Sequence, residues 1–207
     1  MNNLALAYRA ARQLDKALPL LEQALEKRKA KLGLNHPDTL ITMHNLAAAH
    51  LAAKQPDKAL LLFDALVAAH RKRLGPADLH LADRLVHMGL DLLKFGQHAE
   101  AERLLRQGLA IRAQKISDTW WTFHTHALLG GALLGQKKYA DAEPLLVRGY
   151  EGMKQREAKI PPRSRPLLTE VLEMLVRLYE ATDQNEKADA WRKRLKEAKV
   201  AEKKLNP

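Results

Sequence analysis

The phrases ALAY at residues 5–8 and DKALPLL at residues 15–21 decide the fold, because both recur along the chain. The first phrase returns every 42 residues, as AAAH at 47–50 and GLDL at 89–92, and more loosely as GALL at 131–134. The second phrase returns as DKALLLF at 57–63, AEAERLL at 99–105, ADAEPLL at 140–146 and EKADAWR at 186–192. Self-similarity at such a period is typical of repeat proteins whose units stack on one another. We therefore expect about five copies of one unit.

Each unit is predicted to be a pair of helices. In the first helix, Leu4 and Tyr8 lie four residues apart, and in the second helix Leu18, Leu21 and Leu25 keep the same helical spacing. Between the two helices lies a short polar turn that contains Asp, Pro or Gly, residues that commonly begin or end helices. No stretch alternates apolar and polar residues in the manner of a strand.

Small residues recur at one position in each helix. In the first helices they are Ala5, Ala47, Gly89 and Gly130, and in the second helices Ala17, Ala59, Ala101, Ala142 and Ala188. Packed antiparallel helices need a small side chain where their axes approach. Four residues beyond the second set lie the bulky Leu21, Phe63, Leu105 and Leu146, which we expect to fill the space between units. A single pair cannot bury its apolar face, so the units must stack into a curved solenoid.

Composition excludes several kinds of chemistry. The 207 residues carry a net charge of +11 and no cysteine, which excludes disulfide scaffolds, zinc-thiolate sites, iron–sulfur clusters and cysteine nucleophiles. The two serines, Ser117 and Ser164, leave little room for serine-nucleophile chemistry. The nine histidines form no HExxH motif, and His124 and His126 lie two residues apart, on different helix faces. We predict no cofactor, no metal and no enzymatic activity.

The sequence shows neither an export signal nor a membrane-spanning segment. The first fifteen residues lack the basic start and apolar core of a signal peptide. The longest uncharged stretch, 119–136, is too polar to span a membrane. A cytoplasmic protein without membrane contact is expected.

The spacing of small, aromatic and small residues resembles the tetratricopeptide repeat (TPR), and the 42-residue period resembles its kinesin-light-chain type. NNLALAY at 2–8 and LGLNHPDT at 32–39 are similar to hallmarks of that subtype. The tract at 120–157 resembles the C-terminal TPR regions of large bacterial proteins, some of which carry serine/threonine kinase domains. The resemblance implies an all-α fold, a right-handed α–α superhelical solenoid of about five helix-turn-helix repeats.

The domain prediction is a single solenoid over residues 1–207. Its repeats are expected at about 1–34, 38–75, 77–116, 118–158 and 165–204, with a linker at 158–165 that the paired prolines of IPPRSRP favour as extended. Met1 falls three residues into the first helix of the family pattern. The chain therefore either begins raggedly or is the C-terminal part of a longer protein, and the second interpretation is favoured.

The inner groove is the predicted binding surface. Asn3 and Asn45 hold equivalent positions, and an amide that both donates and accepts can pair with the backbone of an extended peptide. The resemblance implies that a ligand in the concave groove contacts Asn2, Asn3, His44, Asn45, His87 and Leu90. The alternative is that the asparagines hydrogen-bond only to neighbouring helices.

Basic clusters lie near the ends of the second helices, at 27–31, 71–73 and 112–115, and a further one lies at 191–204. Cations there offset the helix dipole, which explains their placement without a ligand. The functional alternative is a basic ridge that steers acidic partners. Nucleic acid is a less favoured partner, because the chain offers no periodic set of aromatic side chains on which bases could stack.

These observations predict a protein–protein interaction scaffold or adaptor that holds a peptide or protein surface in its groove. One alternative is the non-catalytic C-terminal interaction region of a larger signalling enzyme, such as a serine/threonine kinase. A basic nucleic-acid-binding helical repeat is the least favoured alternative. The sequence does not indicate the oligomeric state.

Overall fold

The computed structural model describes residues 2–205, without the side chains of 203–205, and these residues form helices and turns but no strand. Two compact units divide the chain after Gln97. The first unit contains α1 (Asn2–Ala10), α2 (Leu14–Leu32), α3 (Pro37–Ala52), α4 (Pro56–Leu74) and α5 (Leu79–Lys94). The second contains α6 (His98–Lys115), α7 (Trp120–Gly135), α8 (Tyr139–Gln155), α9 (Pro166–Ala181) and α10 (Asn185–Leu205). The prediction of an all-α chain is confirmed over these residues.

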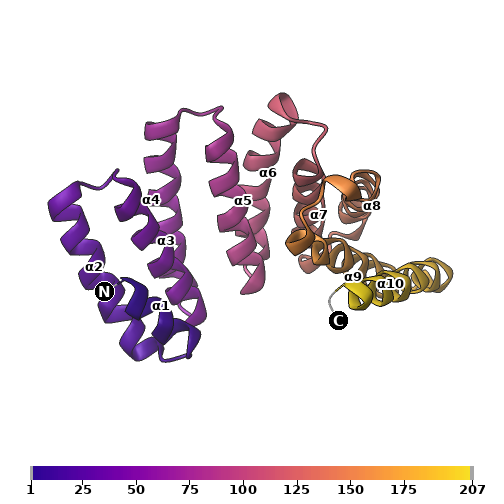
Figure 1. The fold of residues 1–207 in the computed structure, drawn as a ribbon, viewed down its shortest axis with the longest axis horizontal. Helices are drawn as coiled ribbons and strands as arrows, with labels where there is room; N and C mark the ends of the chain where they lie inside the picture. Colours follow the sequence, from indigo (N-terminus) through magenta and orange to yellow (C-terminus); the bar gives the residue numbers. More distant parts are fainter. Residues whose placement is uncertain (1, 206–207) are drawn as a thin grey trace. The chain divides into compact units, whose positions relative to one another are not determined.

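In the first unit, consecutive helices pack against one another from α1 to α5 (Figure 1). In addition, α3 contacts both α1 and α5, so the first helices of successive pairs are neighbours. The predicted small positions Ala5, Ala17, Ala47 and Ala59 are completely buried, and so is the bulky Phe63. Small residues therefore lie where the helices approach and a large residue fills the adjoining space, as the sequence pattern predicts.

The second unit repeats this arrangement, with α7 packed against α6, α8 and α9, and α9 against α8 and α10. Its tightest approach is between α7 and α8. A Cβ atom on Gly130 would lie 2.7 Å from the Leu146 side chain, and one on Gly149 would lie 2.8 Å from the backbone nitrogen of Ala127. Both distances are shorter than van der Waals contact, so these two helices pack at a separation that glycine permits.

The turn inside each pair has one recurring backbone conformation. Arg12, Lys54, Gly96, Lys137 and Asp183 all have positive φ angles, between 56° and 75°. In every case the next residue donates its backbone N–H, at 2.9 Å, to a carbonyl five residues earlier in the preceding helix. This is the hydrogen bond of a helix C-terminus that closes on a left-handed residue. Four of the five positions carry a side chain, although glycine adopts this conformation at the lowest cost.

The segment expected as an extended linker is only partly extended. It contains two short 3-10 helices, η1 (Glu157–Lys159) and η2 (Pro162–Ser164), and Pro161 between them keeps an extended backbone with φ −55° and ψ 142°. The Ile160 side chain is buried, which ties the segment to the unit. That the chain forms a single solenoid with these repeat boundaries stays a prediction. None of the described helices is both long and apolar enough to cross a bilayer.

We predict that Gly149→Ala lowers the free energy of unfolding by about 1–3 kcal/mol, because the added methyl group meets the backbone of Ala127. Gly131→Ala is the matched control, since its Cβ would meet only the Met174 thioether, at 3.0 Å, and methionine repacks easily. Chemical denaturation followed by circular dichroism measures both. Equal destabilisation by the two substitutions would contradict the close α7–α8 approach.

A second prediction concerns the turns. Lys137→Gly should raise the free energy of unfolding by about 0.5–1 kcal/mol, because glycine removes the steric cost of the left-handed conformation. Gly96→Lys should lower it by about 1 kcal/mol for the same reason. The same denaturation assay tests the pair, and two changes of equal sign would refute the account.

Candidate functional site

A pocket opens on the face of the first unit where α3 and α5 lie beside each other. It has a volume of about 170 Å³ and receives side chains from α3, α4 and α5. We call it the basic pocket; its lining residues are Pro37, Leu40, Ile41, His44, Asn45, His70, Arg73, Arg84 and His87. The first three form an apolar rim, and the other six are polar or cationic. None of the lining side chains is a carboxylate.

The electrostatics of the basic pocket centre on His70, which is buried at its wall. Burial, together with the nearby Arg84 and Arg73 guanidinium groups, lowers the pKa of His70 to about 4. Burial and Arg84 also lower the pKa of His87. Both rings are therefore favoured in the neutral form, while the two arginines keep their positive charge. Within the described residues, neither Arg73 nor Arg84 forms a hydrogen bond or an ion pair.

A second pocket lies toward the other end of α3 and α5 and also receives residues from α1 and α2. We call it the end pocket; its lining residues are Arg9, Ala10, Arg12, Leu14, Ala48, Ala52, Asp91, Lys94 and Phe95. Its volume is about 560 Å³. Phe95 is 42% exposed, so the end pocket offers an aromatic surface beside three cations and one carboxylate.

One hydrogen bond connects the two pockets. His44, which lines the basic pocket, lies 2.9 Å from Asp91 of the end pocket, measured from Nε2 to Oδ2. Burial alone would raise the pKa of Asp91, but the bond from His44 and the nearby Lys94 outweigh burial and hold this pKa below its ordinary value. Asp91 therefore stays ionised and anchors His44, and this contact ties α3 to α5.

The structure brings together three of the six predicted groove residues. His44, Asn45 and His87 line the basic pocket. Asn2 does not line it but accepts a hydrogen bond of 3.3 Å from the Asn45 side-chain amide. The equivalent of Asn45 was expected to be Asn3, which is exposed on α1, and Leu90 of α5 lines neither pocket. The peptide-binding role of these residues stays a prediction.

Sequence reasoning missed His70 and Arg84. His70 was not distinguished from the other histidines of the sequence. Arg73 was interpreted only as one of three cations at a helix end. The available signal was helical spacing: Arg73 lies three residues after His70 on α4, and Arg84 three residues before His87 on α5. Residues three apart share a helix face, so each cation accompanies a histidine into the pocket.

The predicted basic ridge needs a correction at Arg112, which is completely buried. Its guanidinium carbon lies 5.0 Å from the centre of the Trp121 ring, within the range of a cation–π contact. In the first unit, Arg28 donates to the Asp38 carbonyl at 2.7 Å and to the Thr42 hydroxyl at 2.6 Å. These two arginines therefore stabilise helix packing, and the basic ridge formed by the other cations of the clusters stays a prediction.

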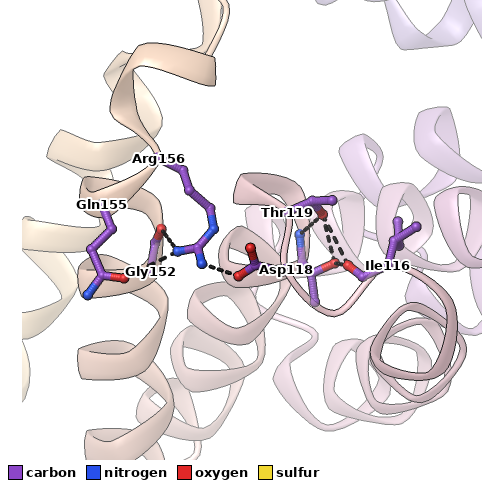
Figure 2. Close-up of polar contacts among 7 residues, drawn as sticks. Ile116, Asp118, Thr119, Gly152, Gln155 and Arg156 are labelled. Atoms are coloured by element: carbon purple, nitrogen blue, oxygen red, sulfur yellow. Dashed lines mark hydrogen bonds and ion pairs between the residues drawn. The ribbon is translucent and has the colours of Figure 1, made fainter.

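Side chains at the start of α7 and the end of α8 form a similar structural cluster in the second unit. Arg156 pairs with Asp118 and also donates to the Gly152 carbonyl at 3.0 Å (Figure 2). Its guanidinium carbon lies 4.5 Å from the centre of the Phe123 ring. Beside this pair, the Thr119 hydroxyl accepts the backbone N–H of Thr122 and begins α7. The cluster fixes the α6–α7 loop.

Buried histidines complete the interior. His124 stacks against Trp121 at 5.2 Å between ring centres, and burial, with a contribution from Arg112, lowers the pKa of His124 to about 4. Burial and Arg148 lower the pKa of His126 to about 4 as well. Among residues 2–205, no group of three or more His, Asp or Glu side chains is placed to hold a metal ion.

The chain matches models of one protein family over about half of its length. Two family models described as tetratricopeptide repeat match residues 1–72 and 81–118, which together are 110 of the 207 residues (72 + 38). The chain belongs to the tetratricopeptide-repeat family. No curated protein sequence matches the chain.

Solved TPR structures are similar over nearly the whole chain. A kinesin-light-chain-like protein of Podosopora anserina with nearly identical TPR-like repeats matches in two crystal structures, each at 25% identity. The first structure, of a single-substitution variant, has a TM-score of 0.76, and the match covers 98% of this chain and 94% of the other. The second structure has a TM-score of 0.74, and the match covers 97% of this chain and 93% of the other. BtubC (BKLC) from P. vanneervenii, at 18% identity, shares the fold with a TM-score of 0.74, covering 99% of this chain and 80% of its own. The predicted TPR array of kinesin-light-chain type is confirmed.

The TPR fold is that of a protein–protein interaction scaffold, and it is typically non-catalytic. TPR arrays generally bind proteins or peptides. The pockets on the α1/α3/α5 face are therefore candidate contact points for a protein partner.

We predict that folding stability falls as pH decreases from 6.5 to 4. Between these values the unfolded chain binds protons at His124 that the folded chain does not, so the folded state loses stability on acidification. His124→Gln should flatten this pH dependence, with a change on the order of 2–3 kcal/mol across the interval. Denaturation midpoints measured at successive pH values test it, with His80→Gln, at an exposed ring, as the control. An unchanged slope in His124→Gln would count against a neutral buried ring.

Proposed function

We propose that the α1/α3/α5 face of the first unit binds an extended segment of a partner protein, so that the chain acts as an adaptor. The observation that supports this most directly is the pair of pockets on that face, joined by the contact between His44 and Asp91. A preformed surface lowers the ordering cost of binding, because the receptor side chains are already held in place.

The length of the face suits a short peptide. Its central helix α3 runs from Pro37 to Ala52, and sixteen residues of α-helix span about 24 Å. An extended chain advances about 3.3 Å per residue, so about seven ligand residues would cover this distance. Side chains at the two ends of such a segment would reach the basic pocket and the end pocket.

The chemistry of the face favours an acidic and partly apolar segment. Ile41 is 47% exposed at the rim of the basic pocket, and Phe95 offers an exposed ring at the end pocket. The two pockets together present five arginine or lysine side chains and a single carboxylate, Asp91. Such an excess of cations attracts anionic partners and disfavours basic ones.

The asparagines retain a role in this proposal. Because Asn45 donates to Asn2, its amide is oriented, and its oxygen remains able to accept from a ligand backbone. That the chain is the interaction region of a larger signalling enzyme, such as a serine/threonine kinase, stays a prediction from the sequence.

The test begins with a random heptapeptide library selected against the full chain, followed by calorimetric titration of the selected peptides. Ile41→Glu should weaken their binding at least about tenfold, because it places a carboxylate on the apolar rim. Leu61→Glu is the matched control, since Leu61 is 73% exposed on α4 and lines neither pocket.

Selection of no peptide, or equal losses in Ile41→Glu and Leu61→Glu, would refute binding at this face. Circular dichroism of both variants establishes that the helices are intact. A fall in affinity with rising salt is also expected, since exposed charges are screened.

A further inference from the structure

The basic pocket contains cations that the rest of the chain does not neutralise. Elsewhere, Arg103 and Arg106 pair with Glu100 and Glu102 at 2.7 Å. Arg73 and Arg84, by contrast, make no ion pair within the described residues, although both lie near the buried His70 ring and lower its pKa. Two guanidinium groups that converge on one pocket without a counter-ion favour an anionic ligand group there.

The charges on the surrounding elements leave this excess in place. On α5, Asp91 is engaged by His44 and lies 3.7 Å from Lys94, so its charge is already compensated. Asp83, also on α5, raises the pKa of His87 through its charge but does not line the pocket. The lining side chains therefore carry two positive charges when the histidines are neutral.

The amount of charge distinguishes between possible ligand groups. A carboxylate brings one negative charge and would leave one guanidinium uncompensated. A phosphorylated serine or threonine brings about −1.5 to −2 at neutral pH and three acceptor oxygens. Each guanidinium can bind two of those oxygens through its planar fork, and the Asn45 amide and the histidine rings supply further donors.

The apolar rim indicates that the phosphoryl group belongs to a peptide. Pro37, Leu40 and the half-exposed Ile41 adjoin the cations, so an apolar ligand residue next to the phosphorylated one would be buried as well. An isolated inorganic ion would leave this rim uncovered. A nucleic acid would require a row of phosphate contacts, whereas this pocket provides one.

We propose that the basic pocket binds the phosphoryl group of a phosphoserine or phosphothreonine in the partner segment, through Arg73 and Arg84, with an apolar ligand residue against Ile41. This inference rests on the proposed function, because it makes attachment to the face dependent on phosphorylation of the partner. The buried His70 ring, whose Nδ1 has no hydrogen-bond partner among the described residues, gives the site a group that can take up a proton when an anion enters.

The experiment uses the full chain and two small probes, N-acetyl-O-phosphoserine amide and N-acetyl-glutamate amide. Their binding is followed by NMR of the histidine ring protons, with the signals of His70 and His87 assigned from His70→Gln and His87→Gln. At physiological ionic strength the phosphoserine probe should shift both signals and bind at least about tenfold more tightly than the glutamate probe. Arg73→Ala and Arg84→Ala should each weaken it at least about tenfold.

Lys72→Ala is the matched control, because it removes one exposed charge from the same turn of α4 without touching the pocket. The proposal is overturned by equal affinity for the two probes, by an equal loss in Lys72→Ala, or by equally tight binding of inorganic phosphate. It is also overturned if an oligothymidylate competes as well as the phosphoserine probe.

The outcome separates this inference from the proposed function. Because the probes contain a single residue, they report on the pocket even if no peptide occupies the whole face. Selected heptapeptides that bind with no preference for a phosphorylated version would overturn the inference alone. Binding of the phosphoserine probe without any heptapeptide ligand would overturn the proposed function alone.

Discussion

The close approach of two helices within a pair is the constraint on which each unit depends. Ala17, Ala59, Ala142 and Ala188 are completely buried on α2, α4, α8 and α10, each of which packs against the first helix of its pair. A larger side chain there would separate the axes and displace the bulky residue four positions later, which fills the space beside it. In the first unit, packing on this pattern leaves α3 in contact with both α1 and α5. The pockets exist because three first helices share one face.

The turns impose a second constraint that acts together with the first. A left-handed residue ends each first helix, and the hydrogen bond that follows it has the same length in all five pairs. Within a unit, backbone geometry sets the angle at which the second helix leaves, so a repeated turn favours repeated packing of α1 on α2, α3 on α4, α7 on α8 and α9 on α10. Lys54 and Lys137 adopt this conformation despite their side chains, so tertiary packing outweighs local preference at these positions.

The sequence predicts the helix pairs and their small positions well, because both depend on local periodicity that recurs in every copy. The pocket is harder to predict. Equivalence between repeats could place His44, Asn45 and His87 on one face. His70 and Arg73, however, lie on the second helix α4, and which of its side chains face the pocket depends on how α5 packs against it. Equivalence between repeats relates Asn45 to Asn3, but it does not reveal that Asn45 donates to Asn2, because a side-chain partner depends on rotamers as well as on register.

Arg112 illustrates the same limit. Its place near the end of a second helix resembles that of the surface cations in earlier repeats, and only the Trp121 ring beside it explains its burial. A repeat pattern assigns equivalent positions, but it does not reveal that a residue exposed in most copies is buried in one of them.

Local geometry therefore says more about partners than the net charge of +11 does. Many of the cations already contact neighbouring groups. Arg28 bridges α2 and α3, and Lys138 and Arg106 both pair with Glu102. The pKa of Glu102 falls to about 2, because the hydrogen bonds from Lys138, Gln136 and Arg106 outweigh its burial. A paired cation attracts an incoming anion weakly, since its field is already cancelled at short range. Two unpaired guanidinium groups beside a buried neutral ring act differently, because no carboxylate lines the pocket to cancel their field. The selectivity of the face for its ligand then depends on where charge is left uncompensated, and in the first unit that place is the basic pocket.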